Sequence, residues 1–485
     1  MSDLNGFIKD VPRDLLIGGH WRPSGDGARI TVCDPATGEA IAAVADGTRD
    51  DGLAAVGAAA AAQPGWAATA PRRRAELLRT VFDRMTERAE DLAGLIVAEN
   101  GKTLQDARAE VAYAAEFFRW YAEEAVRVAG TVQTAPNGAN RILVTRPPIG
   151  VAVLVTPWNF PAAMATRKIG PALAAGCAVV LKPASATPLT ALAIGALIEE
   201  AEIPAGVINV VPSSRSGSVV AAMLADPRVR KLSFTGSTEV GRRLLTAAAD
   251  TVVSCSMELG GNAPFLVFDD ADVDAAVVGA MQAKMRNGGE ACTAANRFYV
   301  QRGIAPEFSR RFTEAMRAVR MGPGTDDSVH LGPLVNADAR DKVAELVDQT
   351  VKLGARVLTG GRTPAGDGFF YPPTVLADVP AAAPVLTEEI FGPVAPIVEF
   401  DTEEEAVRHA NDTEYGLVSY VYTADLARGL RVAEALDTGM VGLNRGLVSD
   451  PAAPFGGAKQ SGLGREGGHE GLLEFTESKY IAVAW

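Results

Sequence analysis

The sequence predicts an α/β protein built on parallel sheets with helices on both faces. From residue 151 onward, short runs of β-branched and apolar residues alternate with stretches of helical periodicity. Such continuous apolar runs are typical of strands buried on both faces, and their alternation with helices is the pattern of a parallel sheet. Ligands of these sheets bind beyond the carboxyl ends of the strands. The runs are VAVLVTP (151–157), AVVLKP (178–183), VINVVP (207–212), KLSFTG (231–236) and APFLVF (263–268).

The remaining segments add helices, a hairpin and a second α/β unit. Residues 50–128 are expected to be mostly helical, because apolar residues recur there at spacings of three and four. Between Thr131 and Arg146, a Pro-Asn-Gly turn precedes the alternating run ILVT, which favours a projecting hairpin. After residue 290, strands and helices alternate again, with RFYV, helical patterns at 338–353 and 402–411, SYVYT and VGLN.

Composition limits the class of protein. A chain of 485 residues is longer than one hydrophobic core normally serves, so two or more domains are expected. With 48% apolar and 22% charged residues, it belongs among compact soluble proteins rather than disordered ones. A net charge of −13 argues against nucleic acid or an anionic membrane as the main partner, since both require a basic surface.

Cysteine, histidine and N-terminal patterns bear on metal and location. No CxxC pair or His-Cys cluster is present, so we expect neither a disulfide framework nor a protein-bound metal. The N-terminus, MSDLNGFIKDVPRDLL, lacks the charge and apolar pattern of a signal peptide, and no apolar run approaches membrane-span length. A cytoplasmic protein is therefore expected. The scattered residues are Cys33, Cys177, Cys255 and Cys292, with His20, His330, His409 and His469.

Two glycine motifs need separate interpretations. GSTEVG, residues 236–241, has phosphate-loop spacing, but Arg242 and Arg243 stand where Lys and Ser/Thr belong. It follows a strand and opens a helix, so a pyrophosphate site and an ordinary tight turn are equally good interpretations. GLGREG, residues 462–467, matches GxGxxG without a strand leading into it, and we interpret it as a loop requiring positive φ values.

Three polar residues lie in unusual settings. Cys292 sits among glycines and small polar residues in NGGEACTAANR, Glu258 ends a strand in MELGG, and Asn159 follows a strand in TPWNFP. A thiolate attacks carbonyls, a carboxylate activates water, and an amide stabilises an oxyanion. Taken singly, each has a plainer explanation as a packing cysteine, an ion-paired carboxylate or a turn residue. Their joint occurrence beside a dinucleotide-type sheet favours aldehyde or acyl chemistry through a thioester.

At this point the chain resembles the aldehyde dehydrogenase superfamily over nearly its whole length. The motifs occur in the family's order: TPWNFP, LKPAS, FTGSTEVG, MELGGN, the GEAC loop, EEIFGPV and PFGGAKQSGLGREGG. The resemblance implies a Rossmann-type cofactor domain, an α/β catalytic domain and a small β oligomerisation hairpin, in a homodimer or homotetramer. The C-terminal strand is expected to pair with the hairpin or with another subunit. The implied boundaries are 1–129 and 149–259 for the dinucleotide-binding domain, 260–460 for the catalytic domain, and 130–148 and 461–485 for oligomerisation.

The resemblance also implies catalytic roles. Cys292 corresponds to the nucleophile, Glu258 to the general base, and the Asn159 side chain with the Cys292 backbone N–H to the oxyanion hole. In this family a thiohemiacetal passes hydride to the nicotinamide, and water cleaves the resulting thioester to a carboxylic acid. CoA-acylating relatives generally lack the glutamate, and a non-catalytic member would have lost one of the three. Both alternatives are therefore disfavoured here.

Cofactor residues are implied in the same way, with NAD or NADP as the cofactor. Likeness points to Thr156, Trp158 and Lys182 toward the adenosine ribose, Gly236 and Ser237 toward the pyrophosphate, and Glu389 with Phe391 toward the nicotinamide ribose. Many NAD-preferring members carry glutamate where LKPAS has Ser185. A carboxylate there repels a 2′-phosphate and serine does not, so NADP is admissible.

The finer resemblance is to succinate-semialdehyde dehydrogenases, in which two arginines and a serine hold the far carboxylate of the small-molecule aldehyde. Arg167, Arg286 and Ser449 match those positions, in ATRKIGPALAAGC, KMRNGGEAC and NRGLVSDPAAPFGG. Guanidinium groups select a carboxylate by charge-assisted hydrogen bonds, whereas the alternative for both arginines is a structural salt bridge. Glutarate semialdehyde remains an alternative substrate. Ala294 stands where some members carry a second cysteine, so a redox switch of that kind is not expected.

Overall fold

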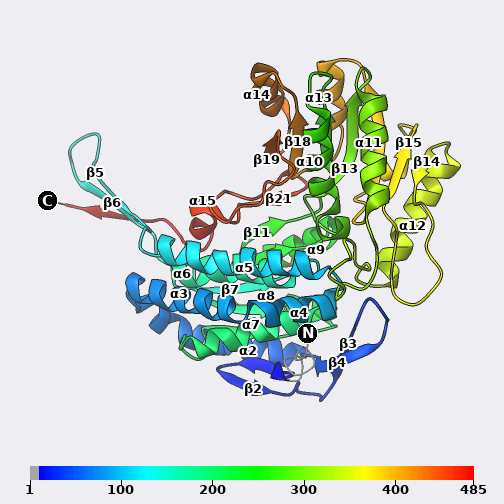
Figure 1. The fold of residues 1–485 in the computed structure, drawn as a ribbon. Helices are drawn as coiled ribbons and strands as arrows, with labels where there is room; N and C mark the ends of the chain where they lie inside the picture. The colour runs from blue at the N-terminus through cyan, green and yellow to red at the C-terminus, as the bar shows by residue number, and fades with distance from the viewer. Residues whose placement is uncertain (1–9, 485) are drawn as a thin grey trace.

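The computed structural model describes residues 10–484, and residues 1–9 and 485 lie outside the described residues, including much of the N-terminal stretch used to predict location. Figure 1 shows two α/β bodies, each built on its own sheet, and a narrow arm that projects from the first body. The chain termini lie in different regions: the C-terminal strand is in the arm, and the N-terminal strands are at the opposite side of the first body (Figure 1). No helix within residues 10–484 is long and apolar enough to cross a bilayer.

The first body contains an eight-stranded sheet whose centre is parallel. Strands β9, β8, β7, β10 and β11 run parallel in that order, which confirms a parallel sheet for the first four predicted runs. The fifth run, 263–268, lies instead in the sheet of the second body, and β11 takes the place expected for it. The chain proceeds from β7 outward to β8 and β9, then returns to β10 and continues to β11, so the order reverses between β7 and β10. This reversal is where open α/β sheets form a ligand crevice. The strands in spatial order are β2 (His20–Arg22), β1 (Leu15–Ile17), β9 (Ile208–Val210), β8 (Ala178–Lys182), β7 (Val151–Val155), β10 (Val229–Thr235), β11 (Ser254–Glu258) and β21 (Gly462–Leu463).

Helices cover both faces of this sheet because alternate residues of its buried strands point to opposite sides. Val153 and Val180 pack on the face of α2 (Arg49–Ala68), α8 (Ser216–Leu224) and α9 (Thr238–Ala249). Leu154 and Leu181 pack on the face of α6 (Pro161–Ala175) and α7 (Pro188–Glu200). The predicted helical region forms α2 and an outer layer of α3 (Pro71–Glu87), α4 (Ala89–Asn100) and α5 (Leu104–Glu124).

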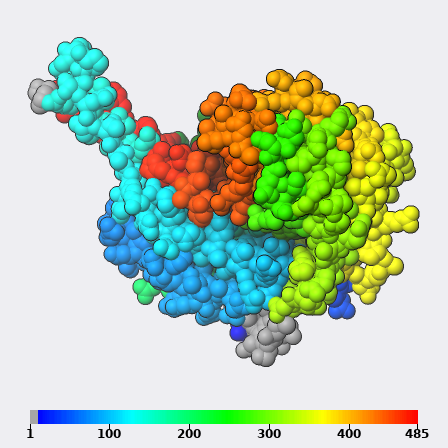
Figure 2. All heavy atoms as spheres, turned by 45° about the horizontal axis from the view of Figure 1, so that its top comes forward, coloured from blue at the N-terminus to red at the C-terminus, as the bar shows by residue number. Residues whose placement is uncertain are grey.

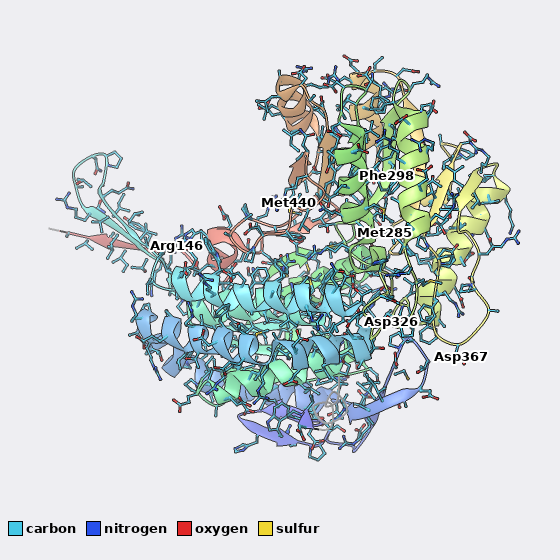
Figure 3. All side chains as sticks on the ribbon, viewed as in Figure 1. Arg146, Met285, Phe298, Asp326, Asp367 and Met440 are labelled. Atoms are coloured by element: carbon cyan, nitrogen blue, oxygen red, sulfur yellow. The ribbon has the colours of Figure 1, made fainter. Side chains whose placement is uncertain are left out.

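The second body contains a seven-stranded sheet, parallel except for the edge strand β14. Its core is aromatic: the rings of Phe265 and Tyr422 lie 5.0 Å apart, as do those of Phe298 and Phe312. Figure 3 marks Phe298 in the middle of this body and Met285 at the end of α10. The strands in spatial order are β14 (Arg356–Thr359), β15 (Thr374–Ala377), β16 (Val394–Phe400), β13 (Ala295–Gln301), β12 (Ala263–Val267), β18 (Val418–Tyr422) and β19 (Met440–Leu443).

The predicted helical patterns at 338–353 and 402–411 correspond to α12 (Ala337–Lys352) and α13 (Glu403–Asn411). The remaining helices of this part of the chain were not assigned from the sequence. They are α10 (Val273–Met285), α11 (Ala305–Ala318), α14 (Leu426–Ala435) and the short η1 (Arg286–Gly289) and η2 (Pro384–Leu386).

The projecting arm is a three-stranded antiparallel sheet. Strands β5 (Thr131–Thr134) and β6 (Arg141–Thr145) form the predicted hairpin, and β22 (Lys479–Val483) pairs with β6 of the same chain. Arg146 marks the base of the arm in Figure 3, and Figure 2 shows the arm extending away from the rest of the surface. The side chains of β5 and β22 are exposed along their whole length.

The loop at residues 462–467 has the expected backbone: Gly462, Gly464 and Gly467 all have positive φ values. It also holds the short strand β21, which pairs with β11 and adds the final strand to the first sheet. Helix α15 (Gly468–Leu473) follows and packs against α5 and α6. Two small ribbons complete the chain: β3 (Arg29–Cys33) with β4 (Ala40–Ala45), and β17 (Tyr415–Gly416) with β20 (Ala458–Lys459).

Candidate active site

The carboxyl ends of the first sheet's strands deliver several predicted site residues to one cavity. Asn159 follows β7, Gly236 and Ser237 follow β10, and Cys292 lies in the loop before β13. The cavity has a volume of about 390 Å³. A larger surface cleft of about 700 Å³ lies between α11 and strands β14–β16, but none of the predicted site residues line it. Predicted residues that line the smaller cavity are Trp158, Asn159, Gly236, Ser237, Cys292, Glu389 and Phe391.

The cysteine loop, residues 290–293, holds Cys292 at the junction of the two bodies. A Cβ atom at Gly261 would lie 2.3 Å from the Cys292 carbonyl oxygen, so only glycine permits this close approach. The Tyr420 hydroxyl donates to the Thr293 carbonyl at 2.8 Å and fixes the end of the loop. Within residues 10–484 the Cys292 backbone N–H donates no hydrogen bond, which leaves it available to a developing oxyanion.

The Cys292 side chain is half-buried. Burial raises the pKa of its thiol to about 12, against the opposing positive charge of Arg167. A thiol with so high a pKa is neutral near pH 7 and must lose its proton as it attacks.

The Asn159 side-chain amide faces the cysteine loop. Its Nδ2 donates to the Glu290 carbonyl at 2.9 Å, two residues before Cys292, and the side chain is 4% exposed. An amide nitrogen carries two N–H groups, so one remains beyond this hydrogen bond. Asn159 and Cys292 line the same cavity, which suits an oxyanion hole formed by an amide and a backbone N–H.

Glu258 ends β11 with a buried and unpaired carboxyl. Among the residues that the structure describes, no group forms a hydrogen bond with either of its oxygens. Burial raises the pKa of Glu258 well above its ordinary value, and the nearby negative charge of Glu466 raises it further. Arg167, Lys168 and Arg465 oppose that shift. A carboxyl in this environment is a suitable proton acceptor, because its conjugate base is stronger than an ordinary carboxylate.

The structure brings together two of the three predicted carboxylate-binding residues. Arg286 donates to the Ser449 hydroxyl at 3.3 Å, and its guanidinium lies 4.9 Å from the centre of the Phe160 ring. Arg286 and Arg167 both act electrostatically on the Cys292 thiol, and both lower its pKa. Both positive charges therefore lie near enough to the nucleophile to favour its thiolate form.

Arg167 has a structural partner as well. Its Nε lies 2.6 Å from a carboxylate oxygen of Glu466, and its guanidinium stacks 4.0 Å from the centre of the Phe455 ring. The salt bridge considered as an alternative for Arg167 is thus present. Its Nη2 atom is buried and has no hydrogen-bond partner in the described part of the chain. The N–H groups at this edge of the guanidinium therefore remain able to donate to a ligand.

The cofactor residues fit a dinucleotide. Lys182 ends β8 and is 4% exposed, and its ammonium makes no hydrogen bond or ion pair among residues 10–484, while burial lowers its pKa to about 8. Thr156 is buried beside it and donates its backbone N–H to the Lys182 carbonyl at 3.2 Å, and Ser185 is half-buried just beyond β8. The unpartnered ammonium is suited to a ribose or phosphate oxygen. Ser237 caps the N-terminus of α9, where phosphate oxygens bind backbone N–H groups.

Two aromatic residues line the cavity: the Trp158 and Phe391 rings meet edge-on at 5.3 Å, so Trp158, expected toward the adenosine ribose, lies against the residue expected at the nicotinamide ribose. Glu389 accepts the Gly261 backbone N–H at 3.0 Å, and burial raises the pKa of Glu389 to about 7. Aromatic walls with a single oriented carboxyl suit a nicotinamide and its ribose.

Four buried polar residues of this region were not singled out from the sequence. Lys102, Glu110, Asn287 and Glu466 are each at most 5% exposed. Glu466 lies inside the GLGREG loop, which we interpreted only through its glycines, and Asn287 lies in the cysteine loop motif itself. A charged residue within a glycine-rich turn was the available signal for Glu466. Lys102 and Glu110 pair with each other, but they carry no such signal, because their contacts with Asn159 and with the start of α6 join distant segments.

Comparisons with known proteins agree with this geometry. The model of the "Aldehyde dehydrogenase family" matches residues 21–481. A succinate-semialdehyde dehydrogenase of Paenarthrobacter nicotinovorans is 56% identical over 444 residues, covering 92% of this chain and 99% of the relative. The NADP(+) succinate-semialdehyde dehydrogenase GabD of Escherichia coli is 48% identical, covering 100% and 99%. A glutarate-semialdehyde dehydrogenase of Pseudomonas putida is also 48% identical, covering 97% and 98%.

Solved structures share the fold over nearly the whole chain. The crystal structure of an NADP-dependent enzyme of Escherichia coli has a TM-score of 0.97 and 46% identity, covering 100% of this chain and 99% of the other. A betaine aldehyde dehydrogenase of Staphylococcus aureus in complex with NAD⁺ has a TM-score of 0.96 and 34% identity, covering 100% and 97%.

Proposed function

The chain belongs to the aldehyde dehydrogenase family, and we propose that this NAD(P)-dependent dehydrogenase oxidises succinate semialdehyde to succinate. The observation that carries the substrate assignment is the contact between Arg286 and Ser449, near the Cys292 thiol. Two relatives named for succinate semialdehyde at 48–56% identity support it.

The proposed reaction begins at the Cys292 sulfur, which bonds to the aldehyde carbon as the C=O π bond opens onto its oxygen and the thiol proton passes to solvent water. The Asn159 amide and the Cys292 backbone N–H donate to the oxygen that becomes negative in the thiohemiacetal. When bound, NAD(P) supplies the acceptor for the hydride that leaves this carbon. Glu258 then takes a proton from the water that attacks the resulting thioester, which releases the carboxylic acid and restores the thiol.

Substrate selection rests on charge at the end of the molecule far from the aldehyde. Arg286 and Ser449 provide charge-assisted and neutral hydrogen bonds to a carboxylate, and the unpaired Nη2 of Arg167 provides another. Glutarate semialdehyde is the second candidate, supported by the Pseudomonas putida relative. Both semialdehydes carry the same terminal carboxylate, so the same cations can bind either one. The additional methylene of glutarate semialdehyde changes selectivity by only about 10- to 200-fold in a hydrophobic pocket.

The proposal leaves the cofactor as NAD or NADP, because Ser185 does not repel a 2′-phosphate. We assign residues 1–129 and 149–259 to dinucleotide binding, 260–460 to catalysis, and 130–148 with 461–485 to oligomerisation, in a homodimer or homotetramer. A cytoplasmic location is supported by the four cysteines, which are all free thiols. A CoA-acylating or a purely binding protein is disfavoured because Glu258, Cys292 and Asn159 are all present.

The substrate assignment predicts a large difference between charged and uncharged aldehydes. Steady-state kcat/KM for succinate semialdehyde should exceed that for butanal by at least about 10-fold, since each charge-assisted hydrogen bond contributes roughly 1.5–3 kcal/mol. Arg286→Met should remove most of the difference by lowering the value for the semialdehyde far more than the value for butanal, on which Arg286 acts only through the Cys292 thiol. Arg356→Met, at an exposed arginine on β14, is the matched control and should leave both values unchanged. Equal kcat/KM for the two aldehydes in the parent enzyme would contradict carboxylate recognition.

A further inference from the structure

We propose that Lys102 and Asn287 are positioning residues for the oxyanion hole. They hold the main chain of Asn159 so that its side-chain amide stays directed at the carbonyl attacked by Cys292. The inference rests on the proposed function, in which Asn159 donates to the oxyanion. We call the group formed by Lys102, Asn287, Asn159 and the Glu290 carbonyl the amide clamp.

The first half of the clamp grips the Asn159 carbonyl oxygen. Lys102 Nζ donates to it at 2.7 Å, and Asn287 Nδ2 donates to it at 2.9 Å. Both donors are buried and come from different segments, the turn between α4 and α5 and the short helix η1 just before the cysteine loop. A carbonyl oxygen has two lone pairs, so two such donors satisfy it fully and restrict its peptide plane.

The second half grips the Glu290 carbonyl oxygen. Asn159 Nδ2 donates to it at 2.9 Å and Asn287 Nδ2 at 3.0 Å. If the Asn159 amide turned over, its Oδ1 would face that carbonyl oxygen, and two acceptors would repel each other in a buried site. The Glu290 carbonyl therefore decides which end of the amide faces the cysteine loop. Asn287 contacts both carbonyls, so it sets their separation.

The clamp is anchored in the first body. Lys102 Nζ also pairs with Glu110 at 2.5 Å and lies 4.1 Å from the centre of the Phe160 ring. The other oxygen of Glu110 accepts the backbone N–H groups of Ala162 at 2.8 Å and Ala163 at 3.2 Å, in the first turn of α6. Through Glu110, Lys102 thus connects the start of α6 to Asn159, two residues before the helix.

Asn287 itself has a special backbone. Its φ is 53°, in the left-handed region that asparagine tolerates better than most residues. Glycine adopts this region without cost, so Asn287→Gly removes the amide while keeping the backbone, and Asn287→Ala adds strain.

A plainer explanation is that Lys102 and Asn287 only stabilise the fold. The Lys231–Glu474 pair is a matched control, because Lys231 is fully buried and its Nζ lies 2.9 Å from a carboxylate, yet neither residue contacts the amide clamp. Removing either buried lysine is expected to lower the melting temperature. Only Lys102 is expected to change the chemical step.

The test measures the single-turnover rate of cofactor reduction, normalised to the titrated Cys292 thiol. Asn159→Ala should lower it by roughly 10²–10³-fold, the usual cost of losing an oxyanion donor. Lys102→Met and Asn287→Gly should each lower it by about 10-fold or more, with cofactor affinity unchanged. Lys102→Met combined with Glu110→Gln avoids leaving a buried carboxylate unpaired and should show the same loss. Lys231→Met should retain the parent rate.

A double-mutant cycle separates positioning from folding. In the Asn159→Ala background, Lys102→Met and Asn287→Gly should cause no further loss, because they act through the missing amide. Full losses in that background, or parent rates for both single variants, would overturn the clamp while leaving the proposed function intact. If Asn159→Ala alone kept the parent rate, the assigned oxyanion role would fall, and the clamp with it.

Discussion

The Cys292 thiol is a weak acid because of where its loop places it. Burial dominates its pKa of about 12, although two arginines act on it. The nucleophile is therefore held as a neutral thiol. This protects it from unwanted electrophiles, and it makes proton removal part of the attack on the aldehyde.

The rate of alkylation of Cys292 in the cofactor-free enzyme should follow this pKa. Inactivation by iodoacetamide should accelerate about tenfold per pH unit from pH 7 to pH 10, without reaching a plateau, because only the thiolate reacts. The measurement is the pseudo-first-order loss of dehydrogenase activity, which exposed cysteines such as Cys33 do not report. A plateau reached below pH 9 would show that the thiol is far more acidic than its burial implies.

Individual residues show what the sequence allows and what it hides. The roles of Cys292, Glu258 and Asn159 were inferred from short motifs, and the structure places Asn159 and Cys292 in one cavity. The Arg286–Ser449 contact was likewise expected. A salt bridge was considered for Arg167, but its partner Glu466 was not identified, because the two residues are far apart in the chain and neither motif refers to the other. The contact of Lys102 with the Asn159 carbonyl escaped notice for the same reason.

Two helices of the first body are capped at their N-termini by carboxyl groups from other elements. Helix α6 begins on Glu110, and α7 begins on Glu99, which accepts the N–H groups of Leu189 at 2.7 Å and Thr190 at 2.8 Å. Neither helix has a side-chain cap from its own preceding residue. Each carboxyl satisfies backbone donors and meets the positive end of the helix dipole. Such distant caps leave no local sequence signature.

The Glu99 cap makes stability depend on pH. Burial raises the pKa of Glu99 from 4.5 to about 7, so the native state favours the protonated form. The contribution to stability is complete below about pH 4.5 and is lost as pH rises through about 7. Glu99→Gln cannot ionise, so its melting temperature relative to the parent should rise by about 2 °C or more between pH 5 and pH 8.5. The exposed Glu87→Gln provides the control for general charge effects.

That comparison is made by thermal unfolding followed by circular dichroism at both pH values. A constant difference between Glu99→Gln and the parent would show that Glu99 ionises as easily in the native protein as in the unfolded chain.

Strands and helices were predictable where their pattern was continuous. The five apolar runs from residue 151 correspond to β7, β8, β9, β10 and β12, because strands buried on both faces leave unbroken apolar sequence. The short strands β1, β2 and β21 at the two ends of the first sheet were not foreseen. They contain two or three residues each. β1 and β21 join the sheet by pairing with the distant strands β9 and β11, and β2 pairs with β1.

Across the whole molecule, the site exists only where the two bodies meet. The first body supplies Asn159 and Glu258, whereas Cys292 lies on the loop that enters the second sheet. Gly261 in the connection between the sheets allows the two backbones to touch at Cys292. Composition predicted more than one domain, but the junction could not be located from it. The motif MELGG contains glycine at residue 261 because a larger residue would collide with the Cys292 carbonyl, a contact that only the tertiary structure shows.

The arm is the least self-sufficient part of the molecule. Val132 is 71% exposed and Tyr480 is 59% exposed, and no layer within the described chain covers the three strands. Small uncovered sheets are marginal in water, so a second copy is the expected cover in the proposed oligomer. Ending the chain at Glu477 removes β22 and should reduce the number of subunits per particle, as measured from the mass by light scattering. Cofactor binding in the active-site cavity should be retained. An unchanged number of subunits would place the subunit contact elsewhere.

If the arm is covered only by another subunit, the resistance of the chain to proteolysis depends on protein concentration. In dilute preparations, trypsin should clip the chain within the β5–β6 hairpin, whereas concentrated preparations should survive the same digestion intact. The amount of each fragment, measured by mass spectrometry, would therefore decrease as the enzyme concentration during digestion increases.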